Sequence, residues 1–423
     1  MKQFRDSVLS GGPLELGDVL RREAAELPEL LSLLELSIAG LPLLEVVQRT
    51  LDALRLGPPL LAACAGPCRP WWTPMPSVYV AALFCHVGLG SLRCSAATAR
   101  DAMPPHARES AALARAAMWK LQLPFEVREH ALALILSYRQ PENLVGSDAP
   151  LEAYMRLACR LDLRALYRLR SAELAALPEG MAARLRPRLE AFRARAQEAG
   201  VFGLAPSVPI SSDQFATLGY LTARAVHRAA NALRYFRLRT GLVDGEWLAD
   251  RLAQESRRPQ GRLNLLVGPA GCGKSTWAEQ HLAHAPIVSS DRMREELTGD
   301  PADQSQNYLV FQRCIGRLRD ALRNGEVVTF DATNYMEGLR ALPVQAARWS
   351  GAEIHSFYFD VGLETVLERN RRRVRRVPEH VIRRQFRLLT PPALYEADQH
   401  WRVDEAGSVR LYWPLDPPQA HAQ

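Results

Sequence analysis

The chain has 423 residues, 48% of them hydrophobic and 23% charged, and its formal net charge is +7. This length predicts two or three domains with packed cores, and the positive charge favours an anionic partner. Seven cysteines without a paired CxxC set argue against a disulfide framework. No apolar run approaches the ~20 residues that span a bilayer, and the N-terminus lacks a signal-peptide core. We therefore expect a cytoplasmic protein without a membrane partner.

Residues 1–205 are predicted to form an all-helical domain. Leucine, alanine and arginine dominate there, and apolar positions recur at helical spacing in "LPELLSLLELSIAGLPLLEVVQRTLDAL" and "ESAALARAAMWKLQL". Residues 206–258 are predicted to be a helical linker. In it a proline-containing stretch, "GLAPSVPISSDQ", precedes one long connecting helix, "FATLGYLTARAVHRAANALRYFRLRTGLV".

Residues 259–415 alternate apolar runs with helical patterns. The runs are "LNLLVG", "APIVSSD", "VVTFDATN", "EIHSFYFDV" and "SVRLYW". Strands that alternate with helices predict an α/β domain whose parallel sheet is covered on both faces. Such sheets bind ligands at the carboxyl ends of their strands. Residues 416–423 are predicted to be a disordered tail, and the fold class is α plus α/β.

The stretch "LLVGPAGCGKSTW", residues 265–277, matches the phosphate-binding loop G-x-x-x-x-G-K-[ST] between a strand and a helix. Its glycines let backbone N–H groups surround phosphate oxygens, and the lysine adds positive charge at the β- and γ-phosphates. The serine hydroxyl is a ligand for Mg²⁺. We therefore expect ATP or another nucleoside triphosphate, together with Mg²⁺, bound by Gly268, Gly271, Gly273, Lys274, Ser275 and Thr276.

The second strand ends in "SSDRMR". Asp291 could accept a proton from an attacking hydroxyl, and Arg294 could grip a phosphate on the acceptor. In the alternative interpretation, Ser290 or Asp291 caps the following helix and Arg294 is solvated.

The third strand ends in "FDATNY". Asp331 could hold Mg²⁺ through water, or it could form an ion pair with Arg294. Thr333 and Asn334 could line the acceptor groove or close a turn. The positions of these side chains at a strand's carboxyl end favour a role in binding.

The fourth strand leads into "LERNRRRVRRVPEHVIRRQFR". Nine arginines fall between Arg369 and Arg387, opposed only by Glu379. Helical spacing puts Arg369, Arg372 and Arg373 on one face. Because phosphoryl transfer leaves charge on phosphoryl oxygens, this run predicts an arginine lid over the nucleotide.

The ordered set of a P-loop followed by Trp, then "SSDxxR", "DATN", "ERNxxR" and "VPEHVI", resembles the 5′-kinase module of phage and bacterial polynucleotide kinases. The resemblance covers about residues 260–413, and "TPPALYEADQHWRVD" resembles the module's closing helix-to-strand passage. Cys272 stands where the loop often carries serine, and it receives no catalytic role.

This resemblance implies roles for particular residues. Asp291 would be the general base on a 5′-hydroxyl, and Arg294 would hold the 3′-phosphate of the terminal nucleotide with support from Asp331. The lid residues on the donor phosphates would be Arg369 and Arg373, with Arg372 as a close rival.

In residues 60–175, "AALFCHVGLGS", "MPPHARESAALARAAMWKLQLP" and "LDLRALYRLRSAEL" resemble an HD phosphohydrolase domain. An active HD site needs a histidine–aspartate pair, further histidines and a distal aspartate to hold divalent metal. Here His86 precedes Val87, a histidine position holds Ser137 and Tyr138, and Glu173 replaces the distal aspartate. We expect His86 and His106 to be packing or hydrogen-bonded residues of a degenerate HD-like domain without phosphatase activity.

The resulting hypothesis is an ATP-dependent polynucleotide 5′-hydroxyl kinase that acts on RNA or DNA ends in repair. A nucleic-acid ligase is a candidate partner. Two alternatives stay open: a P-loop kinase for a nucleoside or metabolite, and a nucleotide-switched nucleic-acid-binding protein without transfer chemistry.

Overall fold

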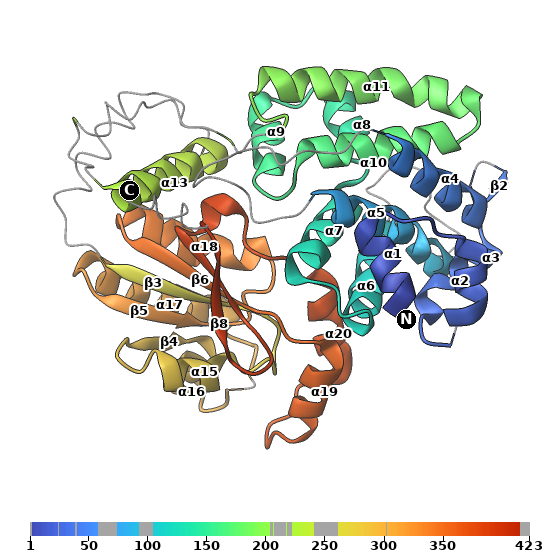
Figure 1. The fold of residues 1–423 in the computed structure, drawn as a ribbon. Coiled ribbons are helices and arrows are strands. Elements are labelled where there is room, and N and C mark those ends of the chain that lie inside the picture. The colour runs from blue at the N-terminus through green and yellow to red at the C-terminus, as the bar shows by residue number, and fades with distance from the viewer. Residues whose placement is uncertain are drawn as a thin grey trace, which may run out of the picture. The chain divides into compact units, whose positions relative to one another are not determined.

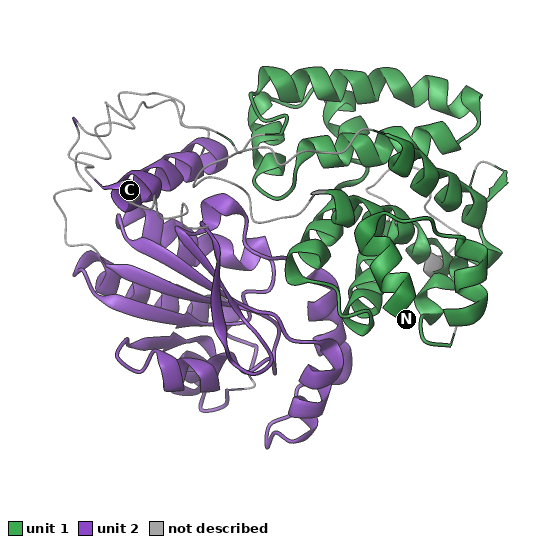
Figure 2. Ribbon diagram, viewed as in Figure 1, with its two compact units in different colours: residues 1–206 green, residues 207–423 purple. Residues whose placement is uncertain are grey.

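The computed structural model describes residues 2–23, 25–38, 40–57, 74–92, 105–203, 222–240, 261–301 and 303–414, with the single residues 206 and 217. The chain divides into two compact units, residues 1–206 and residues 207–423 (Figure 2). The predicted tail at residues 416–423 lies outside the described residues. In the part of the chain that is described, no helix is long and apolar enough to cross a bilayer.

The first unit is built from helices, as its apolar spacing predicts (Figure 1). One feature departs from the all-helical expectation: β1 (Ser37–Ile38) and β2 (Leu41–Pro42) pair as a tight antiparallel hairpin. Gly40, with a φ of 82°, supplies the left-handed backbone that this turn requires. The helices are α1 (Lys2–Ser10), α2 (Leu16–Glu23), η1 (Pro28–Leu30), α3 (Ser32–Glu35), α4 (Leu43–Leu56), α5 (Pro74–Phe84), η2 (Val87–Leu92), α6 (Pro105–Lys120), α7 (Phe125–Ser137), α8 (Gln140–Gly146), α9 (Leu151–Ala158), α10 (Leu163–Ala176) and α11 (Glu179–Glu198).

The second unit is organised around a mostly parallel sheet of six strands in the order β4-β5-β3-β6-β7-β8. All neighbours in this sheet are parallel except β7 and β8, which are antiparallel. The strands are β3 (Arg262–Val267), β4 (Ile287–Ser289), β5 (Val327–Asp331), β6 (Glu353–Phe359), β7 (Gln399–Val403) and β8 (Val409–Trp413). The helices are α13 (Ala223–Thr240), α15 (Lys274–His281), α16 (Ser290–Thr298), α17 (Asn307–Arg323), α18 (Glu337–Trp349), α19 (Leu363–Arg371), α20 (Glu379–Leu388) and η3 (Leu394–Glu396).

Strand β7 was not among the apolar runs that the sequence marks, although the helix-to-strand resemblance of "TPPALYEADQHWRVD" includes this segment. Strand β8 is antiparallel rather than parallel. The segment "QHWRV" is only partly buried, so it lacks the continuous apolar run of a central strand. Asp398, the residue before β7, fixes its position: the carboxylate accepts a 2.8 Å hydrogen bond from the Ile354 N–H and pairs with buried Arg348 at 2.8 Å. The position of β7 therefore depends on a tertiary contact that local pattern cannot show.

Helix α13, expected to connect two domains as a linker, is instead packed as part of the second unit. The Asn231 side-chain amide donates to the Ala397 carbonyl at 2.9 Å, and the His227 and Trp413 rings lie 4.8 Å apart. Much of the rest of the expected linker, including residues 241–258, lies outside the described residues. Phe236 on α13 is buried, and its ring lies 5.1 Å from that of Trp349 on α18, so the helix also packs against the second unit through an apolar side chain.

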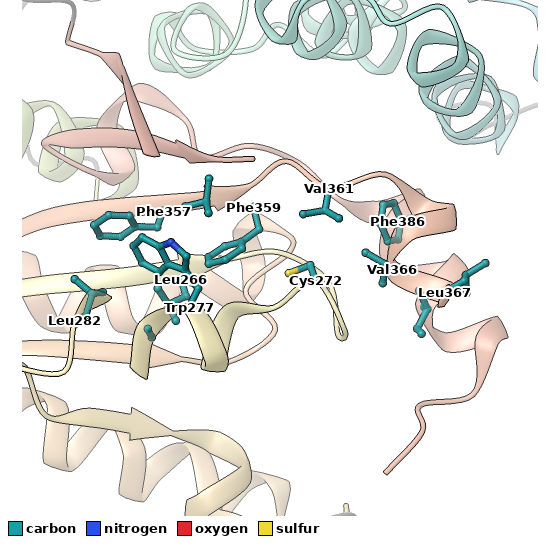
Figure 3. Close-up of a cluster of buried hydrophobic side chains, with 13 residues drawn as sticks. Leu266, Cys272, Trp277, Leu282, Phe357, Phe359, Val361, Val366, Leu367 and Phe386 are labelled. Carbon is teal, nitrogen blue, oxygen red and sulfur yellow. The ribbon is translucent and has the colours of Figure 1, made fainter. Parts of the chain in front are cut away.

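A cluster of buried apolar side chains joins the P-loop helix and the arginine-rich helices to the sheet (Figure 3). Trp277 on α15 lies 5.1 Å from the ring of Phe357 and 5.6 Å from that of Phe359, both on β6. Val366 of α19 and Phe386 of α20 belong to the same cluster. This packing holds the elements of the candidate site in place, because a close-packed interior resists displacement.

Candidate active site

The phosphate-binding loop connects β3, at the centre of the sheet, to α15. Gly271 and Gly273 have φ values of 84° and 102°, which side chains with a Cβ rarely adopt. A Cβ on Gly268 would lie 2.8 Å from the Cys272 sulfur, so this position also requires glycine. The sequence "GPAGCGKS" thus forms a loop whose shape depends on its glycines.

Lys274 is buried at the start of α15, with 7% of its surface exposed. Its Nζ donates to the carbonyls of Gly268 at 3.0 Å and Pro269 at 2.7 Å. The ammonium group is therefore held beside the loop, where a nucleotide's phosphates can exchange for the carbonyls.

The Ser275 hydroxyl donates a 2.6 Å hydrogen bond to the Asp331 carboxylate. The two residues meet because β5 pairs directly with β3, which places the end of β5 beside the loop. A hydroxyl and a carboxylate oxygen fit the ligand preference of Mg²⁺. The residues present therefore suit the expected metal, whereas the expected support of Arg294 by Asp331 is not found among the described contacts.

Asp291 lies in the first turn of α16, at the carboxyl end of β4. The helix cap is Ser289, whose side chain accepts a hydrogen bond from the Arg292 N–H at 3.4 Å. The alternative that Ser290 or Asp291 caps this helix is therefore wrong. Asp291 lines the same cleft as the phosphate-binding loop, and its side chain is 60% exposed.

Arg294 lies one turn further along α16 and is 5% exposed. Its Nη1 donates to the Asp291 carboxylate at 2.8 Å, and its Nη2 donates to the Asn307 side-chain oxygen at 3.0 Å. Arg294 therefore orients the Asp291 carboxylate. A direct grip on an acceptor phosphate, as expected from the sequence, requires one of these contacts to be exchanged.

Thr333 and Asn334, which follow β5, have different surroundings. Thr333 lines the cleft. Asn334 is 1% exposed, and its amide donates to the Leu266 carbonyl at 2.9 Å. Asn334 therefore ties the end of β5 to β3 and does not line an acceptor groove, which corrects the expectation for this residue.

We call residues 363–388, which comprise α19, α20 and their connection, the lid. Arg369 donates to the carbonyls of Cys272 at 3.0 Å and Glu405 at 2.7 Å, so it lies against the phosphate-binding loop. Arg373 also lines the cleft, but Arg372 pairs with Glu368 and is not among the lining residues. The expected common face fails because α19 ends at Arg371, so helical spacing does not extend to residues 372 and 373.

The cleft has a volume of about 490 Å³, which lies within the range of roughly 300–1,000 Å³ typical of small-molecule sites. Sequence reasoning missed two of its supports. Gln385 on α20 accepts a 2.7 Å hydrogen bond from the Ala270 N–H in the loop. The turn between β7 and β8 also lines the cleft, and its Gly407 carbonyl accepts from the Trp277 indole at 3.1 Å. No sequence motif marks Gln385. The tryptophan that follows the P-loop, Trp277, is the one sequence signal of the contact with Gly407.

In the first unit, His86 and Glu173 do come together, with 2.9 Å between Nε2 and the carboxylate. Arg170 pairs with both Glu173 and Glu142, and all three side chains are buried. Burial alone would raise the pKa of Glu173, but the charges of Arg170 and His86 lower it well below its usual range. The carboxylates thus already have a guanidinium counter-ion.

His106 and Tyr138 form a second contact in this region, with 2.7 Å between Nε2 and the phenol oxygen. Burial, followed by the charges of His86 and Arg139, lowers the pKa of His106 to about 4. Within the described residues, no group of three or more His, Cys, Asp or Glu side chains is placed to hold a metal ion. Both histidines are thus hydrogen-bonded in a buried polar cluster.

Comparison with known protein families matches residues 263–392 to an AAA domain. The matched region runs from β3 through the lid, and it excludes the first unit and the β7–β8 hairpin. The second unit thus contains a P-loop, kinase-like nucleotide-binding domain.

Proposed function

We propose that the second unit is an ATP-dependent polynucleotide 5′-hydroxyl kinase that acts in nucleic-acid end repair. The observation that carries the proposal is the position of Asp291. This exposed residue lines the same cleft as the phosphate-binding loop and the lid arginines Arg369 and Arg373. A proton acceptor beside a phosphate cradle is the arrangement that a hydroxyl-phosphorylating enzyme needs.

In the proposed reaction, the acceptor hydroxyl gives its proton to Asp291 as its oxygen bonds to the γ-phosphorus of ATP. The bond between that phosphorus and the β–γ bridging oxygen breaks, and ADP leaves with the electron pair. Lys274 and Arg369 stabilise the charge on the phosphates. Ser275 and Asp331 would hold Mg²⁺, which would supply further charge neutralisation.

A nucleic-acid acceptor is favoured by charge. The net charge is +7, and several lid arginines are exposed. Some of these arginines pair with carboxylates, as Arg371 does with Glu379. The nine arginines of the lid still outnumber its three glutamates, and a nucleic-acid backbone supplies phosphates that offset this excess of positive charge. In this proposal a ligase is the partner that would use the 5′-phosphate product. The first unit is proposed to be a degenerate HD-like domain without phosphatase activity.

A second candidate function is a kinase for a nucleoside or a small metabolite. The burial of Arg294 favours it, because an arginine already bonded to Asp291 and Asn307 does not demand a phosphate on the acceptor. The two candidates differ in which acceptor is phosphorylated, not in the phosphate donor.

The test is to incubate the purified full-length protein with γ-labelled ATP, Mg²⁺ and a panel of acceptors: 5′-hydroxyl RNA, 5′-hydroxyl DNA and free nucleosides. We expect label at the 5′ end of oligonucleotides. The label should be lost when Mg²⁺ is chelated, and also in Lys274→Ala, because that variant removes the positive charge that stabilises the transferred phosphoryl group. Label on nucleosides without any on oligonucleotides would instead establish the small-molecule kinase.

A further inference from the structure

Arg375 lies in the connection between α19 and α20 and reaches across to the acceptor side of the cleft. Its Nη2 donates to the Pro301 carbonyl at 2.6 Å, and its Nη1 lies 3.8 Å from the Asp291 carboxylate. The side chain is 43% exposed and lines the cleft. From these contacts we infer that Arg375 is a specificity-determining residue that binds a phosphate on the acceptor, next to the hydroxyl that is phosphorylated.

The surrounding arginines separate into groups by their contacts. Arg369 faces the phosphate-binding loop through the Cys272 carbonyl, which is the donor side. Arg371 pairs with Glu379 at 3.3 Å, outside the residues that line the cleft. Arg375 differs from both, because its partners belong to α16 and to the segment that follows it. The lid therefore presents different arginines to the donor and the acceptor.

The present partners of Arg375 can be exchanged at small cost. An ion pair between partly exposed groups contributes little to stability, and the carbonyl of Pro301 carries no net charge. A phosphate offers a guanidinium two parallel charge-assisted hydrogen bonds, which are about twice as strong as neutral ones. When a phosphate enters the cleft, Arg375 should therefore exchange its contacts with Pro301 and Asp291 for hydrogen bonds to the phosphate.

Arg294 is less suited to this task in the described arrangement. Its side chain is 6% exposed and is held by Asp291 and Asn307. Arg375 contacts the same carboxylate from the open side of the cleft. A phosphate bound there lies close to the proton acceptor, as the 3′-phosphate of a terminal nucleotide does when its 5′-hydroxyl meets Asp291.

The inference rests on the proposed function for its choice of acceptor, but it can be tested by binding as well as by turnover. The probes are adenosine 3′-monophosphate and adenosine, which differ only in the phosphate. Affinities for both are measured by calorimetry with full-length protein, alongside kcat/KM for phosphorylation with ATP and Mg²⁺. The variants are Arg375→Ala and Arg375→Lys, and the matched control is Arg371→Ala, which removes an exposed arginine outside the cleft lining.

We expect Arg375→Ala to lower affinity and kcat/KM for the 3′-phosphorylated probe by about 10–100-fold, the worth of a hydrogen bond to a charged group. The affinity and kcat/KM for adenosine should change little. Arg375→Lys should have an intermediate effect, because lysine keeps the positive charge but cannot form the two parallel hydrogen bonds of a guanidinium. An unchanged preference for the 3′-phosphate in Arg375→Ala, an equal loss on both probes, or the same loss in Arg371→Ala would overturn the inference. If binding behaves as expected but neither probe nor oligonucleotide is phosphorylated, Arg375 is a phosphate-binding residue of this cleft and the proposed kinase activity fails.

Discussion

The Asp291 side chain is available to the cleft because Ser289, and not Asp291, caps the helix α16. Ser289 accepts the hydrogen bond from the Arg292 N–H, and Arg294 holds one oxygen of the Asp291 carboxylate at 2.8 Å. We therefore predict that Asp291→Asn lowers kcat by roughly 10²–10⁴, the usual contribution of a positioned proton acceptor. Rapid-quench assays measure the rate, and circular dichroism with ATP titration checks that fold and donor binding persist. Near-normal turnover would remove Asp291 from the chemistry.

The contact between Ser275 and Asp331 makes a separate prediction about the metal. Asp331→Asn keeps a side chain of nearly the same shape that can still accept from Ser275, but it removes the negative charge. We expect the Mg²⁺ concentration for half-maximal activity to rise by about tenfold or more, comparable with the loss of a supporting contact at a metal site. The measurement is an initial-rate titration with Mg²⁺ at saturating ATP. A higher KM for the acceptor with an unchanged Mg²⁺ requirement would assign Asp331 to the acceptor instead.

At the scale of elements, α20 serves two parts of the fold. Ile382 and Phe386 are buried in the core cluster, and Gln385 between them binds the Ala270 N–H of the phosphate-binding loop. Gln385→Ala removes this contact from a loop that must hold a fixed shape. We predict an increase of about 3–10-fold in the KM for ATP, the value of one neutral hydrogen bond.

Arg384→Ala is the control for the Gln385 variant, because Arg384 is an exposed neighbour on the same helix. Steady-state kinetics with ATP as the varied substrate make the comparison. Equal KM values for ATP in the wild type and in Gln385→Ala would show that the loop keeps its shape without help from α20.

The sequence predicts an element well where its pattern is local. The P-loop between β3 and α15 is an example, because glycine spacing and the strand–helix context are both encoded within a short stretch. Local apolar pattern fails where a distant partner determines the structure. The buried Asp398–Arg348 pair positions β7, and the buried Asn334 side chain donates to the Leu266 carbonyl instead of lining the cleft. Helical spacing also misplaced Arg372, because α19 ends one residue before it.

At the scale of the whole molecule, each unit contains a buried histidine that folding keeps neutral. Burial, with neighbouring charges, lowers the pKa of His106 to about 4 in the first unit, and burial lowers that of His400 to about 3 in the second. Below pH 6.5 the unfolded chain binds protons that the folded chain does not, so stability falls as the pH falls. We predict that both units lose thermal stability between pH 6.5 and 5.

Calorimetric scans at several pH values test this prediction. In that range Glu173 and Glu353, whose pKa values are lowered in the folded state, stay largely ionised whether the chain is folded or not. The slope therefore belongs to histidines, and His106→Asn should reduce it for the first unit alone. Unfolding temperatures that are constant from pH 7 to pH 5 would contradict the lowered pKa values of His106 and His400 in the folded state.

The last prediction concerns the division of work between the units: the full-length protein should modify 5′ ends and leave 3′ ends unchanged. Metal-dependent hydrolysis needs several ligands around one ion to activate water. Here Glu173 and Glu142 are paired with Arg170, whose guanidinium supplies the positive charge that a metal would bring to these carboxylates. Val87, beside His86, offers no atom that can bind a metal, and the Tyr138 phenol is hydrogen-bonded to His106. Oligonucleotides ending in 3′-phosphate or 2′,3′-cyclic phosphate should therefore release no phosphate with Mn²⁺, Ni²⁺, Co²⁺ or Mg²⁺. Metal-dependent release that disappears in His86→Ala would mean that the carboxylates exchange Arg170 for a metal ion and that the first unit is an active phosphatase.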